Sequence, residues 1–195
     1  MKVILVSASP RRKALLELLG WQIELRPAAV EETLVEGISP SQQAMVLALR
    51  KLSTALPTLQ KGEVAIAADT IVYHAGQILG KPRDIEEARH FLYRLSGQWH
   101  IVYTGVAVGT VERSWSFYEE TAVRFHSLSK ELVESYLQRT PPLDKAGAYG
   151  AQDLIGLVGI AEIRGDFYNV MGLPVQKLAR FWQQVFGVLF APENK

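Results

Sequence analysis

Apolar and polar positions along the first half of the chain follow the periods of strands and helices in turn. Residues 3–6 and 64–68 are short continuous apolar runs, the pattern of central strands covered on both faces. The first run is followed by a predicted helix with apolar residues at positions 15, 18 and 19, closed by Gly20. Residues 22–25 suggest another strand, residues 27–38 a loop, and Ser39-Pro40 the start of a helix running to about Leu56. Alternating strands and helices predict an α/β fold.

The second half of the chain combines amphipathic helices with a pair of alternating strands. Asp84 is expected to cap a helix that carries one apolar face and ends at Gly97. Residues 99–109 and 115–126 alternate and favour β-branched and aromatic residues, which predicts two antiparallel strands. Helices are predicted to begin at Ser129 and at Pro174, and residues 140–156 form a turn-rich segment. Strands are predicted over 157–164 and 167–170, joined by a hairpin turn at Gly165-Asp166.

Size and charge favour a globular protein with a small ligand. The chain has 195 residues, of which 48% are apolar and 21% charged, enough to form a core without disulfides or metals. This suits one domain or two closely packed lobes, and we expect a single domain over residues 1–195. A formal net charge of +1 provides no broad basic field, so nucleic acid is not an expected partner and any anion site must be local.

The absence of cysteine limits the chemistry of the protein. Without cysteine the chain has no disulfides, no thiolate catalysis and no cysteine-ligated zinc, and this composition fits a reducing cytoplasm. The apolar run before Ser7 is too short for a signal sequence or a membrane span, and no later run is long enough. We therefore expect a soluble, cytoplasmic protein with no membrane partner.

The segment from Ser7 to Arg12 places two cations at the start of a helix. Ser9 is expected to be the N-cap and Pro10 the first helical residue, so Arg11 and Arg12 fall in the first turn. The unpaired N–H groups and the helix dipole are already positive there. Two arginines at this end therefore favour a bound anion, with phosphate as the natural candidate. In the alternative, both arginines extend into solvent or pair with distant carboxylates.

Two further charged residues stand where apolar ones would be expected. Lys51 lies on the apolar face of its helix, so its amine must reach solvent along its own stem or meet an anion, whereas Arg50 lies off that face and is expected to be solvated. Asp69 follows the apolar run 64–68, where a buried carboxylate requires a cation, a metal or a reacting water. The alternative for Asp69 is the capping of a tight turn. Ser7 also ends a strand, and open α/β sheets bind ligands outside such ends.

Loop residues add groups that suit a metal and a phosphate. Glu31-Glu32 and Lys81 are of kinds common on surfaces, but together they offer oxygen ligands for a divalent cation and another cation for phosphate. The four histidines show no metal-ligand spacing and are expected to be structural or exposed. The chain has neither a P-loop nor a dinucleotide-binding glycine motif. Ser7 and Ser9 have no evident base partner that would make them nucleophiles.

Several segments, in order over nearly the whole chain, resemble the Maf family of nucleoside triphosphate pyrophosphatases. They are Ser7-Ala8-Ser9-Pro10-Arg11-Arg12, Glu31-Glu32-Thr33, Ala68-Asp69-Thr70, Gly80-Lys81-Pro82-Arg83-Asp84, Leu95-Ser96-Gly97, residues 144–152 and residues 169–174. The resemblance implies an α/β fold with an elongated, two-lobed mixed sheet and flanking helices, like that of inosine triphosphate pyrophosphatases. It also implies a cleft between the lobes and often a homodimer.

The resemblance further implies an activity and a subgroup. Members hydrolyse a nucleoside triphosphate to the monophosphate and pyrophosphate with a divalent metal, Mg²⁺ or Mn²⁺, a role that fits nucleotide-pool housekeeping. Arg11, Thr70 and Gln152 match the subgroup that resembles dTTP/UTP pyrophosphatases. The subgroup acting on 7-methyl-GTP typically has glutamine after the aspartate and a bulky residue at the first arginine.

The resemblance and the charge pattern together suggest roles for the site residues. Glu32 and Asp69 would hold the metal, and Asp69 would activate the attacking water. Arg12, Lys51 and Lys81 would neutralise the phosphates, with hydrogen bonds from Ser7 and Ser9. Arg11, Thr70 and Gln152 would read the base.

Two points qualify this assignment. The chain departs from its relatives at Arg50, where they usually have an acidic or polar residue, and at Leu52, where they usually have a small one.

A different class of function is a nucleotide-binding regulator of cell division that senses a nucleotide without turnover. The presence of Glu32, Asp69 and the lysines favours the enzyme, because phosphate binding alone does not require a carboxylate nearby.

Overall fold

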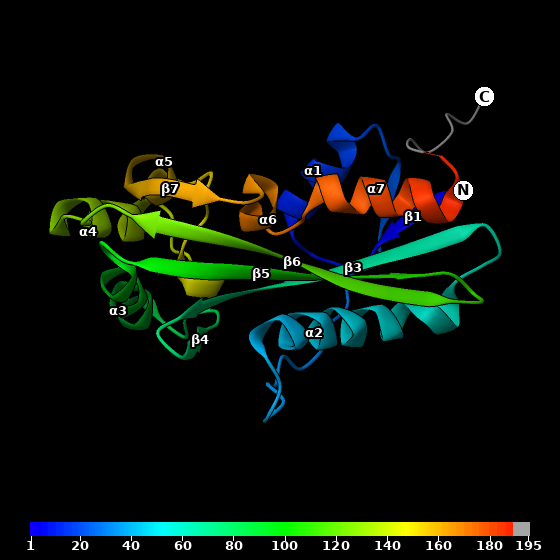
Figure 1. Ribbon diagram of the computed structural model, residues 1–195, viewed down its shortest axis with the longest axis horizontal. Helices are drawn as coiled ribbons and strands as arrows, with labels where there is room; N and C mark the ends of the chain where they lie inside the picture. Colours follow the sequence, from blue (N-terminus) through cyan, green and yellow to red (C-terminus); the bar gives the residue numbers. More distant parts are fainter. Residues whose placement is uncertain (189–195) are drawn as a thin grey trace. The chain divides into compact units, whose positions relative to one another are not determined.

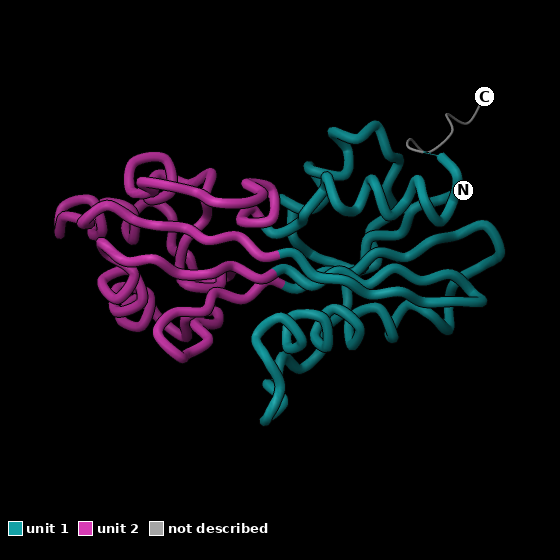
Figure 2. Tube along the Cα trace, viewed as in Figure 1, with its two compact units in different colours: residues 1–69, 104–119, 172–195 teal, residues 70–103, 120–171 magenta. Residues whose placement is uncertain are grey.

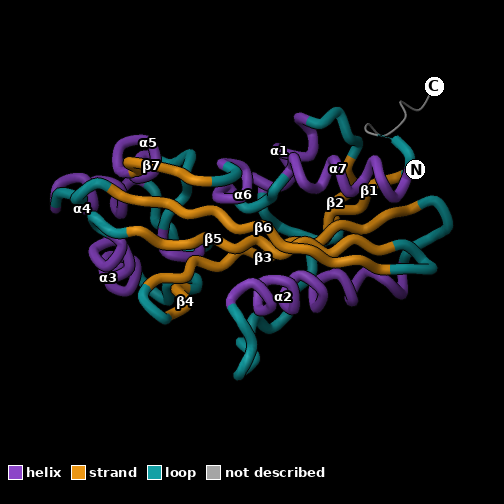
Figure 3. Tube along the Cα trace, in the orientation of Figure 1, coloured by secondary structure: helices purple, strands orange, loops and turns teal. Residues whose placement is uncertain are grey.

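A computed structural model describes residues 1–188 and shows a mixed α/β structure (Figure 1, Figure 3). The strands are β1 (Lys2–Leu5), β2 (Ile23–Leu25), β3 (Glu63–His74), β4 (Gln77–Leu79), β5 (Trp99–Gly109), β6 (Ser114–Phe125) and β7 (Ile160–Arg164). The α-helices are α1 (Pro10–Leu18), α2 (Pro40–Ala55), α3 (Ile85–Leu95), α4 (Lys130–Arg139), α5 (Leu154–Gly159), α6 (Phe167–Met171) and α7 (Val175–Phe186), with short 3₁₀ segments η1 (Leu56–Thr58) and η2 (Ala146–Ala148). The sheet is mixed, because β1 pairs in parallel with β2 and β3, whereas β4 is antiparallel to β3 and β7 to β6.

The chain divides into two compact units (Figure 2). Unit 1 comprises residues 1–69 and 104–119 and the chain from Gly172 onward, and unit 2 comprises residues 70–103 and 120–171. The long strands β3, β5 and β6 each contribute residues to both units. The single domain over residues 1–195 stays a prediction.

Unit 1 places its helices against the strands through small residues. The apolar core of this unit includes Ile4, Ala48, Leu52 and Ala67, all at most 1% exposed. A Cβ atom at Gly105 of β5 would lie 2.3 Å from the backbone carbonyl of Ala44, so only glycine lets α2 approach this closely. Helix α2 covers one side of the unit 1 strands, and α1 and α7 lie on the other (Figure 1).

Unit 2 has its own core between α3, α4 and the strands. Leu92 of α3, Val133 of α4 and Phe125 of β6 are fully buried in one apolar cluster. Asn169 of α6 is also fully buried, and its Nδ2 donates to the carbonyl oxygen of Val102 at 3.1 Å and to the hydroxyl of Thr121 at 3.0 Å. Asn169 begins the last segment of the family resemblance, and its contacts here are structural.

Most predicted helix starts are confirmed. The N-cap residues Ser9, Ser39, Asp84 and Ser129 all accept a hydrogen bond from the backbone three residues on, and Ser39 forms a full capping box with Gln42. The prediction that Leu18 lies on the apolar face of α1 is wrong, because Leu18 is 80% exposed whereas Leu16 is buried. Leu15 and Leu16 face the core instead.

The predicted strands over 157–164 and 167–170 need correction. Residues 154–159 form helix α5, and strand β7 begins only at Ile160. A Cβ atom at Gly156 would lie 2.3 Å from the carbonyl oxygen of Ala151, so glycine permits this tight helical turn. Residues 167–171 form helix α6, because the Asp166 carboxylate accepts from the Tyr168 backbone at 2.7 Å and turns the chain helically.

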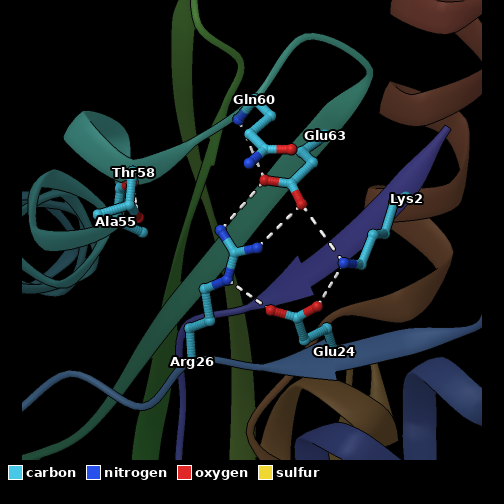
Figure 4. A network of polar contacts seen from close by, with 7 residues as sticks. All are labelled: Lys2, Glu24, Arg26, Ala55, Thr58, Gln60 and Glu63. Carbon is cyan, nitrogen blue, oxygen red and sulfur yellow. Dashed lines mark hydrogen bonds and ion pairs between the residues drawn. The ribbon is translucent and has the colours of Figure 1, made fainter.

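A network of charged side chains joins the parallel strands β1, β2 and β3 within unit 1 (Figure 4). Arg26 donates to both oxygens of Glu63, at 2.9 and 3.1 Å, and to Glu24 at 2.6 Å, while Lys2 contacts both glutamates. Hydrogen bonds from Arg26 lower the pKa of Glu63, and those from Lys2 and Arg26 lower the pKa of Glu24. The network therefore supports the register in which Lys2 lies opposite Glu63.

Within residues 1–188, none of the helices has the length and apolar character needed to cross a membrane.

Candidate functional site

An ammonium group between two carboxylates forms the centre of the candidate site in unit 1. Lys51 of α2 donates a hydrogen bond to Asp69 of β3 and another, at 2.8 Å, to Glu32 in the loop between β2 and α2. The side chains of Lys51 and Asp69 are only 11% and 7% exposed, whereas that of Glu32 is 34% exposed. Of the two alternatives for Lys51, the structure shows the one in which its amine meets an anion, and Asp69 lies within a central strand instead of capping a turn.

The loop that carries Glu32 is bound to α2 at two further points. Arg50 donates from Nη1 to the carbonyl oxygen of Thr33 at 2.6 Å, and the backbone N–H of Val35 donates to Oε1 of Gln43 at 2.8 Å. The expectation that Arg50 is merely solvated is therefore wrong. A helical projection shows that Arg50 lies off the core face, but it cannot show that a loop covers that side.

The first turn of α1 brings Ser7 and Arg12 together. Arg12 donates from Nε to the carbonyl oxygen of Gly172 at 2.8 Å and from Nη1 to the hydroxyl of Ser7 at 3.3 Å. The Ser7 hydroxyl also accepts from the backbone N–H of Ser9 at 3.2 Å. Burial lowers the pKa of Arg12, although a guanidinium remains charged at neutral pH. These contacts already orient Arg12 before any anion binds.

Ser9 and Arg11 occupy the positions that the sequence predicted. The hydroxyl of Ser9 accepts from the backbone N–H of Arg12 at 3.5 Å, so it caps α1 and leaves its own proton available to a ligand. Arg11 follows Pro10 in the first turn, and its side chain is partly exposed. The N-terminus of α1 therefore has the composition of an anion site.

Three predicted site residues belong to unit 2. Thr70 follows Asp69 in β3, and Lys81 is exposed in the loop after β4. Gln152 donates from Nε2 to Asp153 at 3.1 Å, and its Oε1 is buried without a hydrogen-bond partner among residues 1–188. That these three residues join the group around Lys51 in one site stays a prediction.

The segments that carry Lys81 and Gln152 are connected within unit 2. The backbone N–H of Gly147 donates to the carbonyl oxygen of Gly80 at 3.0 Å. Gly147 has a φ of +66°, and a Cβ atom there would lie 2.9 Å from Val72. The glycine in this segment is therefore required by both conformation and space.

Asp153 is a residue that the sequence analysis missed. Its carboxylate accepts from Gln152 and also from the hydroxyl of Tyr136 at 3.0 Å, and it lies 3.5 Å from the ammonium of Lys145. Burial raises the pKa of Tyr136, so the phenol stays protonated and donates. The signal available in the sequence was only the position of Asp153 directly after Gln152.

His100 has a structural position, one of the two expected for the histidines. His100 is 2% exposed in the core of unit 2, and its Nε2 lies 2.7 Å from the hydroxyl of Tyr149. Burial lowers the pKa of His100 to about 3, so the ring is neutral. In residues 1–188, no group of three or more His, Cys, Asp or Glu side chains is arranged to hold a metal ion.

A divalent cation nevertheless fits the pair Glu32 and Asp69. Both carboxylates contact one ammonium group, so their oxygens lie within reach of a single cation. Ions such as Mg²⁺ are commonly bound through only one or two carboxylates, with water and substrate phosphates completing the shell. The donor set therefore suits a metal that arrives with a polyphosphate.

Comparison with known proteins covers almost the whole chain. A family model described as "Maf-like protein" matches residues 2–185. A protein named dTTP/UTP pyrophosphatase from Bacillus cytotoxicus is 45% identical over 183 residues, which cover 94% of this chain and 95% of that protein. A protein of the same name from Bacillus cereus matches with the same identity and coverage.

Two solved structures also show some likeness. A nucleoside-triphosphatase / dITP/XTP pyrophosphatase from Mycobacterium abscessus is 18% identical with a TM-score of 0.41, over 64% of this chain and 74% of that chain. The Staphylococcus aureus Ham1 protein is 13% identical with a TM-score of 0.47, over 64% and 72% of the two chains.

Proposed function

Because this chain belongs to the Maf family, we propose that it hydrolyses nucleoside triphosphates to the monophosphate and pyrophosphate, with dTTP and UTP as favoured substrates. The relatives named dTTP/UTP pyrophosphatase, at 45% identity over nearly the full length, support this activity. The single structural observation that carries the proposal is the buried Asp69 carboxylate, paired with Lys51 beside Glu32. The second carboxylate supplies the further oxygen donor that a shared metal ion needs.

Asp69 is proposed as the general base of this reaction. Its carboxylate would accept a proton from the water that attacks the α-phosphorus, so no covalent intermediate is needed. Lys51 compensates the charge of Asp69 in the free protein and would turn to the phosphate oxygens when the substrate binds. This exchange of partners keeps the buried charges balanced in both states.

Glu32 and Asp69 are the residues proposed to hold the divalent metal, Mg²⁺ or Mn²⁺. When bound, such an ion would neutralise charge on the triphosphate and polarise its phosphoryl oxygens. Ser7, Ser9 and Arg12 would bind phosphate oxygens at the N-terminus of α1, where the helix dipole also favours an anion.

Lys81, Thr70, Gln152 and Arg11 are also proposed to contact the substrate. Lys81, exposed on its loop, would bind a further phosphate oxygen. Thr70, Gln152 and Arg11 would recognise the pyrimidine ring through hydrogen bonds. Groups that are matched to the edge of one base remain unpaired when a different base binds, and this difference would give the specificity. The hydrogen bond to Asp153 restrains the side chain of Gln152, which supports this role.

The cellular setting belongs to the proposal as well. We propose action on free nucleotides in the cytoplasm, as nucleotide-pool housekeeping by a homodimer, without a nucleic-acid partner. The absence of cysteine and the net charge of +1 support the compartment and the small substrate.

Pyrophosphate release from purified protein tests the activity. The panel would contain dTTP, UTP, CTP, ATP, GTP and 7-methyl-GTP, each with Mg²⁺, with Mn²⁺ and with a chelator. We expect metal-dependent release that is fastest with dTTP and UTP. Tight nucleotide binding without release under any condition would overturn the proposal in favour of a regulator of cell division that only senses nucleotides.

A further inference from the structure

Three side chains of α2 hold one short stretch of the loop that precedes it. Lys51 contacts the carboxylate of Glu32, Arg50 contacts the carbonyl oxygen of Thr33, and Gln43 accepts from the backbone N–H of Val35. All these residues belong to unit 1. The order of the contacts shows that the stretch 32–35 runs antiparallel to α2.

The spacing of these contacts suits an extended chain. Gln43 and Arg50 are seven residues apart, which is about two helical turns, so they lie on nearly the same side of α2 and about 10 Å apart along its axis. The groups that these two side chains contact belong to Thr33 and Val35, which lie about 7 Å apart in an extended chain. An extended stretch of this length lies within the span that Gln43 and Arg50 offer along the helix.

The contacts matter because the stretch has no secondary structure of its own. Residues 26–35 contain no helix or strand, and the residues around Glu32 are exposed. Fixing such a backbone costs conformational entropy for every residue. Gln43 is itself only 1% exposed, so its acceptor is held firmly by the packing of α2.

We propose that Arg50 and Gln43 are positioning residues that hold Glu32 in place beside Lys51 and Asp69. They act on the backbone at Thr33 and Val35, and Glu32 then reaches the site without having to order its own loop. The importance of this position for catalysis rests on the role of Glu32 in the proposed function. That these residues hold the loop does not rest on the proposed function, because it follows from the contacts alone.

Hydrogen exchange of the free protein tests whether the loop is held. In Gln43→Met and in Arg50→Met, the backbone N–H groups within residues 28–38, that of Val35 above all, should exchange about tenfold faster than in the unaltered protein. Methionine has about the length of glutamine and keeps most of the apolar stem of arginine. Unchanged exchange in both variants would overturn the proposal, whether or not the protein hydrolyses nucleotides.

Ser53→Ala is the matched control on the same helix. The Ser53 hydroxyl donates within α2, to the carbonyl oxygen of Arg50, and its side chain is exposed. This variant should leave the exchange of residues 28–38 unchanged. Faster exchange in Ser53→Ala equal to that in Arg50→Met would show a general loosening of α2, and would also overturn the proposal.

The metal dependence of pyrophosphate release tests whether the position of Glu32 matters. In Arg50→Met the Mn²⁺ concentration for half-maximal rate should rise about tenfold, as is typical when a group supporting a ligand is lost, while the rate at saturating Mn²⁺ changes little. Arg50→Lys, which keeps a cationic donor, should recover part of the shift. A lower saturating rate with unchanged Mn²⁺ dependence would overturn the positioning role. Failure of the unaltered protein to release pyrophosphate would instead refute the proposed function.

Discussion

Lys51 and Asp69 form an ion pair that is almost entirely removed from solvent, with side chains 11% and 7% exposed. A buried charge that loses its partner retains the full cost of its desolvation. Each residue is therefore needed by the other in the free protein, before any substrate binds.

Lys51→Met should lower the free energy of unfolding by about 3–5 kcal/mol, because it leaves the Asp69 carboxylate buried beside Glu32 without its ammonium partner. The double variant Lys51→Met/Asp69→Asn should recover most of this loss, because the buried charge is removed together with its partner. Urea denaturation of the two variants measures the difference. Equal stability of the single and double variants would contradict a pairing of this strength.

Asp69→Asn should still fold, because Lys51 keeps its contact with Glu32. It should lose about 10²–10⁴-fold in turnover, because an amide of nearly the same shape cannot accept the proton of the attacking water. The measurement is the rate of pyrophosphate release at saturating metal, with nucleotide binding followed separately. Binding should persist, since Lys51 and Arg12 remain. Turnover close to normal would reject Asp69 as the base.

Lys81→Met should reduce kcat/KM for the triphosphate roughly 10- to 100-fold, the effect of losing one charged hydrogen bond to a phosphate. Because Lys81 is exposed in its loop, the free energy of unfolding should change by less than about 0.5 kcal/mol. Lys61→Met, at another exposed lysine, is the control and should leave both quantities unchanged. Equal losses of kcat/KM in the two variants would show that Lys81 is not part of the site.

Thr70→Ala and Gln152→Ala should each reduce the preference for dTTP and UTP over CTP, ATP and GTP, with little change in metal requirement. A discrimination of about 2–3 kcal/mol, the cost of one or two lost hydrogen bonds, corresponds to a roughly thirty- to over a hundredfold preference in kcat/KM. Gln138→Ala, an exposed glutamine on α4, serves as the control. A flat profile across nucleotides, or a preference for 7-methyl-GTP, would contradict the assignment of specificity but not the activity.

The stability of the protein should fall as the pH drops below about 6.5. His100 has a folded-state pKa of about 3, below the usual value of 6.5, so only the unfolded chain takes up this proton between those values. The unfolded state then binds more protons, and the free energy of unfolding should decrease by up to about 1.4 kcal/mol per pH unit.

The range from pH 6.5 to 5 isolates this effect, because the carboxylates with lowered pKa values, such as Glu63, contribute only below about pH 4.5. Denaturation at several pH values gives the slope, and His100→Phe should abolish most of it. An unchanged slope in His100→Phe would assign the pH dependence to other groups.

Local signals in the sequence were sufficient for much of the fold. The caps at Ser9, Ser39 and Asp84 were predicted because an N-cap bonds to the backbone only three residues away. The same reasoning failed at residues 157–159 and 167–170, where short helices replace the predicted strands. There a close approach at Gly156 and a side-chain bond from Asp166 outweigh the β-branched composition.

The sequence by itself determined which residues carry unusual charge: Lys51 on an apolar helix face, Asp69 after an apolar strand, and arginines at a helix start. These anomalies are visible locally, because periodicity shows which side of an element is buried. Only the tertiary structure decided the partners. Asp69 lies 18 positions from Lys51, and Gly172 lies 160 positions from Arg12, so these hydrogen bonds depend on the path of the whole chain. The same reason explains why Arg50, solvated by its helical position, instead binds the loop that carries Glu32.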